Sequence, residues 1–227
     1  MKNLTITQDE QVFNYTIPSS WNEVSLGQYM KLMSGMKEDM SEQEKTFVVI
    51  NALCGIPMPK ISKMKMSDVG EVYNHLLELT TKKLNQGLNL IIEVDGVEYG
   101  FHPKLQDMTF AEFTDLDTFL QQDQFGNLDK IMSVLYRPIT HKVKKGYDVE
   151  PYDFSKAEEV AKVFKDKLSI NTVHGALGFF LNLGQEYMQI SVAYLGKQAK
   201  KMKKKSDTEP MKTPLVQNGD GINSFTS

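Results

Sequence analysis

The sequence predicts an α+β protein with a mainly helical body, two β-hairpins, a long C-terminal helix and a polar, lysine-rich tail. Two segments, 4–17 and 88–101, alternate apolar and polar residues around a turn, as hairpins do. The other segments place apolar residues three and four positions apart behind helix-capping signals. With 227 residues, 41% of them hydrophobic and 24% charged, the composition is that of a globular chain.

The first hairpin is expected over residues 4–17, where Leu4 and Ile6 alternate with threonines and a second run returns after a polar turn. A helix follows it. Ser25 and Gln28 form a capping box, in which each side chain can bond the other residue's amide. We expect this helix to end near Gly35.

A second capping box, Ser41 to Glu44, predicts a helix that stops at Gly55. Residues 56–59 contain two prolines and are expected to form a loop. Ser67 is expected to cap a third helix, which Gly87 would close.

The second hairpin, 88–101, turns at Asp95-Gly96, a pair typical of type I′ turns. Thr109 then begins a capping box with Glu112, and Met108 and Phe113 are placed to form a hydrophobic staple across it.

The remaining body is expected to be helical. Asn127 is expected to cap a helix over 128–136, and 141–151 reads as a polar connector. Ser155 is expected to cap the next helix, and Ser169 or Asn171 to open a long helix reaching about 195.

Three regions follow from this pattern: a hairpin–helix body at 1–140, a helical part packing on it at 141–196, and a basic, polar tail at 197–227. Residues 24–29 align with residues 108–113 at an offset of 84. This favours either an internal duplication, 1–87 and 88–140, or a recurrent local way to start a helix after a hairpin.

The sequence contains no motif of a catalytic, cofactor-binding or metal site. It has no phosphate-binding loop, no zinc-protease motif and no nucleophile elbow. The four histidines lack metal-ligand spacing, and His75 is expected at the surface or its boundary. The single cysteine, Cys54, is expected to be a buried, inert thiol. We therefore expect a protein that is not an enzyme and binds no cofactor or metal.

Arg137 is the only arginine among 26 basic residues. Because it precedes a proline, its backbone is pushed out of the helical region. Its guanidinium could then clamp a carboxylate, with Glu112, Asp115 and Asp117 as the candidates. We expect a structural salt bridge.

The tail begins with a run of basic residues. Such a run is either a solvated end, a strap onto an acidic surface or a non-specific contact to nucleic-acid phosphates. The six residues are Lys197, Lys200, Lys201, Lys203, Lys204 and Lys205.

Three segments carry a family resemblance. Residues 17–25 resemble an "IPxSWxEVT" opening, 108–120 a "LTxxEFxDLExY" segment and 131–139 an "IMAVLYRPI" segment. Together they resemble small proteins from the structural and assembly gene blocks of tailed phages infecting Bacteroidota, including crAss-like phages. The resemblance spans roughly residues 15–140. Ala111 and Asp117 depart from it, since glycine and glutamate are usual there.

The resemblance implies a virion-associated phage protein, made in the host cytoplasm and present in several copies. It would act as a head–tail or tail component or as internal cargo, through contacts with portal, tail or capsid proteins. The alternatives are a tail assembly chaperone that is absent from the mature particle, and a non-specific nucleic-acid-binding protein acting through the lysine run. The stretch 173–195 is interrupted by polar residues, so no membrane span is expected.

Overall fold

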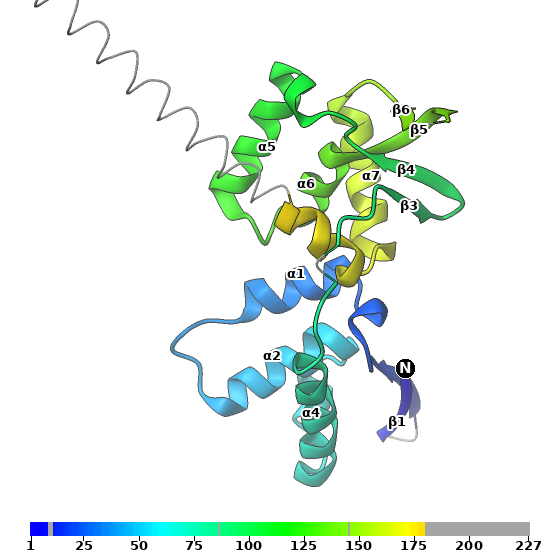
Figure 1. Cartoon of the computed structure of the whole chain (residues 1–227). Coiled ribbons are helices and arrows are strands. Elements are labelled where there is room, and N and C mark those ends of the chain that lie inside the picture. The colour runs from blue at the N-terminus through cyan, green and yellow to red at the C-terminus, as the bar shows by residue number, and fades with distance from the viewer. Residues whose placement is uncertain (9–10, 86, 145, 180–227) are drawn as a thin grey trace, which may run out of the picture. The chain divides into compact units, whose positions relative to one another are not determined.

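The computed structural model describes residues 1–8, 11–85, 87–144 and 146–179 (Figure 1). Within them, helices and strands alternate in groups, which confirms the α+β class. The strands are β1 (Lys2–Gln8), β2 (Gln11–Ile17), β3 (Ile91–Val94), β4 (Val97–Phe101), β5 (Tyr136–Val143) and β6 (Gly146–Val149). The helices are α1 (Leu26–Gly35), α2 (Glu42–Cys54), α3 (Met58–Ile61), α4 (Met66–Thr80), α5 (Phe110–Asp123), α6 (Leu128–Leu135) and α7 (Phe154–Lys167). Two short 3-10 turns, Trp21–Glu23 and Leu105–Asp107, precede α1 and α5.

The strands form two antiparallel sheets, β1-β2 and β3-β4-β5-β6. The two predicted hairpins are confirmed, and Asp95 and Gly96 both have positive φ, 49° and 79°, as a type I′ turn requires.

The segment 141–151 was wrongly predicted to be a connector, because β5 and β6 form a third hairpin there. Pro138 obscured the strand, since a proline usually interrupts one. Here it lies beside a register shift at Ile139 and His141, where a missing amide proton is tolerated.

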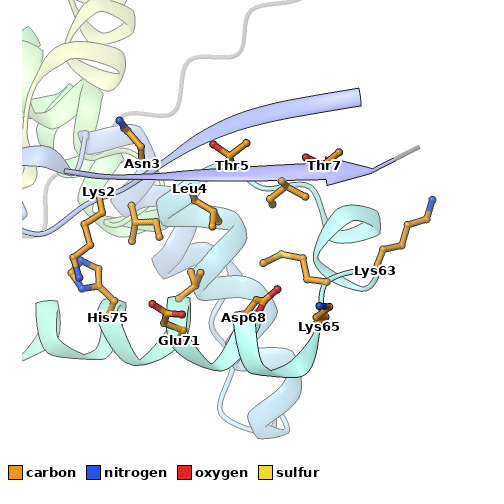
Figure 2. A pocket seen from close by; sticks show the side chains of 14 residues that line it. Lys2, Asn3, Leu4, Thr5, Thr7, Lys63, Lys65, Asp68, Glu71 and His75 are labelled. Atoms are coloured by element: carbon orange, nitrogen blue, oxygen red, sulfur yellow. The ribbon is translucent and has the colours of Figure 1, made fainter. Parts of the chain in front are cut away.

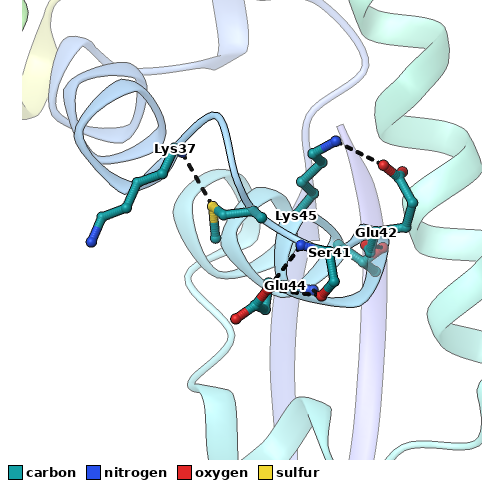
Figure 3. Close-up of polar contacts among 7 residues, drawn as sticks. Lys37, Ser41, Glu42, Glu44 and Lys45 are labelled. Carbon is teal, nitrogen blue, oxygen red and sulfur yellow. Dashed lines mark hydrogen bonds and ion pairs between the residues drawn. The ribbon is translucent and has the colours of Figure 1, made fainter.

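Helix starts follow the predicted capping boxes at Ser25, Ser41 and Thr109. Figure 3 shows the second of these: Ser41 Oγ accepts from the Glu44 amide at 3.3 Å, and Glu44 Oε2 accepts from the Ser41 amide at 2.8 Å. At the other end of α2, Gly55 adopts φ 69°, the left-handed conformation that ends a helix.

Two other predicted caps, Ser67 and Ser155, are wrong, whereas Asn127 occupies the predicted N-cap position of α6 (Leu128–Leu135) without a side-chain capping bond. Helix α4 begins at Met66 with no side-chain cap and ends at Thr80, before Gly87. The side-chain Nδ2 of Asn127 instead donates to the preceding carbonyls of Phe119 and Asp123.

Helix α7 is capped by Asp153, whose carboxylate accepts from the amides of residues 155 and 156. The predicted loop at 56–59 also contains the start of α3. The last described helix begins after Ser169, whose Oγ accepts from the Thr172 amide. The rest of the expected long helix lies outside the described residues.

The hydrophobic core draws on both sheets and on the helices around them. On the larger sheet, Phe164 of α7 meets the ring of Tyr99 on β4 edge-on, with 4.9 Å between centroids. Helix α1 contacts α2, α6 and α7. Cys54 is buried in this core, as predicted.

The same order of elements occurs twice at an offset of 84 residues. Strands β2 and β4 end at Ile17 and Phe101, and a 3-10 turn follows each. A capping box then starts α1 at Ser25 and α5 at Thr109, and a second helix follows each.

Candidate functional site

A buried ion pair joins α5 to the larger sheet. The carboxylate of Glu112, 1% exposed, accepts through Oε2 from the Thr109 amide at 2.6 Å and from its hydroxyl at 2.7 Å. Its Oε1 lies 2.9 Å from Nη1 of Arg137, whose side chain is 12% exposed. One carboxylate therefore closes the capping box and neutralises the only arginine.

Arg137 occupies β5 opposite Gly100, and it has the extended backbone expected for a residue before a proline. Burial lowers the pKa of the guanidinium, and the charge of Glu112 opposes that shift. Arg137 and Glu112 therefore form an ion pair between two largely buried side chains.

The structure selects one of the three candidate carboxylates. Asp115 instead accepts a hydrogen bond from the Tyr152 hydroxyl at 2.5 Å, and Asp117 accepts from Gln121 on its own helix at 2.8 Å. Burial, and then the hydrogen bond to Asp115, raise the pKa of Tyr152, so that this phenol stays a donor.

His102 joins this group, and the sequence did not single it out. It is buried, its Nε2 lies 3.5 Å from Glu112 Oε1, and its Nδ1 accepts from the Lys104 amide. This places the ring proton on Nε2. Burial lowers the pKa of the imidazole, the nearby Arg137 adds to that shift, and Glu112 opposes it. No pattern in the sequence marks the position, because the neighbours that bury it are distant in the chain.

A cavity of about 200 Å³ lies beside Arg137 and Tyr152. Its lining also includes Glu150, Asp153, Glu159 and Lys156, so it carries three carboxylates against one guanidinium and one ammonium group. Lys156 is ion-paired with Glu150 at 3.2 Å. The excess of negative charge disfavours an anionic ligand here.

A second hollow, of about 410 Å³, lies between β1 and α4 (Figure 2). Lys2, Lys63 and Lys65 border it together with Asp68 and Glu71, so charges of both signs line it. A groove of mixed charge and no deep enclosure gives no preference for one class of ligand.

His75 borders that hollow, at the surface boundary expected for it, and makes the nearest approach to a catalytic arrangement among the described residues. Its Nε2 lies 3.2 Å from the Ser19 hydroxyl, and its Nδ1 lies 3.9 Å from Glu78. That last distance is too long for the hydrogen bond that orients a catalytic base. The Ser19 amide, which could stabilise an oxyanion, donates to Glu23 at 2.7 Å. We read this contact as structural.

The outer face of α5 carries exposed aromatic side chains. Phe110 is 85% exposed and Phe113 is 60% exposed. Asp117, one turn further along, is also exposed. A hydrophobic pair on an exposed helix face is typical of a contact surface for another protein.

The lysine run lies outside the described residues. In the described part of the chain, no cluster of three histidine, cysteine or acidic side chains could hold a metal ion. The helices described there are all too short or too polar to cross a bilayer. Comparison with known proteins finds no matching family model, curated protein or solved structure.

Proposed function

We propose that this chain is a non-enzymatic bacteriophage protein that acts through protein–protein contacts in the virion, as a head–tail or tail component or as internal cargo. The resemblance of residues 17–25, 108–120 and 131–139 to phage structural and assembly proteins supports the phage origin. The observation that supports action through protein–protein contacts is the exposed Phe110–Phe113 pair on α5.

Aromatic side chains are enriched in protein interfaces. Truncation of an aromatic side chain that is a hot spot weakens the binding free energy by more than about 1 kcal/mol. The buried ion pair of Glu112 and Arg137 supports the same reading, because it fixes the helix that presents both rings. A rigid helix presents its side chains to a partner with little loss of conformational entropy on binding.

Quantitative mass spectrometry of purified particles tests the proposal. We expect several to many copies of the chain in each particle. The double variant Phe110→Ser/Phe113→Ser should lower the number of retained copies by about tenfold or more, since two interface aromatics are lost. The matched control is Met66→Ser/Leu77→Ser, which removes two exposed apolar side chains from α4.

Absence of the chain from particles, together with abundance in infected cells, would contradict a virion role. That result would favour a tail assembly chaperone, which acts only while the particle is built. If particles retained both double variants in equal copy number, the virion location would stand, but α5 would not be the contact surface.

A further inference from the structure

Helices α1 and α5 begin at equivalent positions, 84 residues apart, but they differ in what covers them. In α1, Leu26 and Met30 are buried, and Tyr29 between them is half-buried. The residues 84 positions later are Phe110, Thr114 and Phe113, and all three are exposed. One helix therefore buries the face that the other leaves open.

A segment of the same chain covers the start of α1. The Leu26 amide donates to the Leu168 carbonyl at 2.7 Å, and the Ile170 amide donates to the Val24 carbonyl at 3.0 Å. Ser25 thus pairs with Ser169 in an antiparallel bridge, and the side chains of residues 168 and 170 are buried.

At the start of α5 no such strand is present in the part of the chain that the structure describes. The equivalent backbone groups are the Phe110 amide and the Met108 carbonyl, and no described residue bonds to either of them. The start of α5 therefore offers both a short strand edge and an apolar surface.

Charge decides what kind of segment fits this face. Helix α5 has no lysine or arginine, and two of its four acids, Asp117 and Asp123, are exposed. Of the other two, Glu112 is paired with Arg137, and Asp115 accepts a hydrogen bond from Tyr152. A second copy of α5 on the same face would bring acidic side chains together, which is unfavourable. A basic partner is attracted to the exposed Asp117.

We propose that the Phe110–Phe113 face of α5 docks an extended, aliphatic segment bearing lysine or arginine from a different protein of the particle. This rests on the virion role proposed above. The segment would pair with the backbone at 108–110, as residues 168–170 pair with 24–26, and would lay its aliphatic side chains on the two rings.

The docked segment is a strand and not a helix end. In α1, Gly27 lets the end of α7 approach closely, since a Cβ there would lie 2.9 Å from the Lys165 carbonyl oxygen. The equivalent residue of α5 is Ala111, whose methyl group occupies that space. A partner helix could not be seated as α7 is, whereas an extended segment crossing at 108–110 avoids the methyl group.

Photo-cross-linking in particles tests the proposal. The photoreactive residue p-benzoylphenylalanine replaces Phe113, and as a control replaces Met66, which is 82% exposed on α4. After irradiation of purified particles, we expect the position-113 cross-link to map to an aliphatic, lysine- or arginine-bearing peptide of another particle protein. We expect position 66 not to yield that peptide.

Charge reversal sharpens the test. Asp117→Lys should lower the cross-link yield at least severalfold. Glu158→Lys, the same reversal of charge at an exposed position on α7, should leave the cross-link yield unchanged. Thermal unfolding of each purified variant verifies that it is folded.

Three results would overturn the proposal while the chain is still counted in particles. They are cross-links only to a second copy, cross-links only within the same chain, and no cross-link at 113. If Asp117→Lys and Glu158→Lys changed the cross-link yield equally, the partner segment would not be basic. Absence of the chain from particles would instead overturn the virion role itself, so the two failures are distinguishable.

Discussion

Arg137 contacts Glu112 at 2.9 Å, twenty-five positions before it in the chain. The residues 84 positions earlier, in the first half of the repeated pattern, are Gln28 and Leu53. They also contact each other, through a hydrogen bond that Gln28 Nε2 donates to the Leu53 carbonyl at 2.8 Å. In both cases the third helical residue after the N-cap contacts a distant residue: Leu53 in the last turn of α2, and Arg137 in β5, two residues beyond the end of α6. The second half uses charge for this contact, and the first uses a neutral amide.

Arg137→Leu should lower the free energy of unfolding by about 3 kcal/mol, because it leaves Glu112 charged and unpaired in the core. Glu112→Gln/Arg137→Leu installs the residues of the first half, and it should recover part of that loss. Chemical denaturation of both variants measures the difference. A double variant less stable than the single one would show that the carboxylate does not need its partner.

Stability should fall as pH drops below about 6.5, the ordinary pKa of histidine, through the titration of His102. Its pKa is lowered in the folded state, so below 6.5 the unfolded chain binds the proton first. The contribution is fully present above that pH and is lost as pH falls toward the folded-state pKa. His102→Gln should remove this part of the pH dependence. The check is denaturation from pH 7.5 to 5 for both proteins, and parallel curves would refute the assignment.

Gly27→Ala should destabilise the protein by about 1–3 kcal/mol, although alanine ordinarily favours a helix. The added Cβ would meet the Lys165 backbone at 2.9 Å, and backbone cannot move away as a flexible side chain can. Ala111→Gly is the matched change at the exposed position, and it should cost no more than about 1 kcal/mol, from helix propensity alone. Thermal unfolding compares them, and a stabilised Gly27→Ala protein would contradict the close contact.

Cys54 should be unreactive in the folded protein. Burial raises the pKa of its thiol to about 12, so little of the reactive thiolate exists near neutral pH. A thiol reagent at pH 8 should label the native chain far more slowly than the chain in guanidinium chloride. Because this is the only cysteine, all labelling reports on it. Equal rates in the two conditions would place the thiol at the surface.

The sequence by itself determined the elements whose signals are local. The capping boxes at Ser25, Ser41 and Thr109 and the turn at Asp95-Gly96 each depend on residues within a few positions of one another. Such signals depend only on residues close together in the chain, and they could be read without knowing the fold.

The tertiary structure decided what depends on distant partners. The β5–β6 hairpin was missed because its polar strands are stabilised by pairing with β4. The ion pair of Glu112 with Arg137 and the burial of His102 both depend on the packing of α5 against the larger sheet. Phe110 and Phe113 resemble the core residues of α1 in sequence, yet they are exposed because no described segment covers them. Burial and ion pairing are properties of the whole packed chain, and for that reason a local pattern could not specify them.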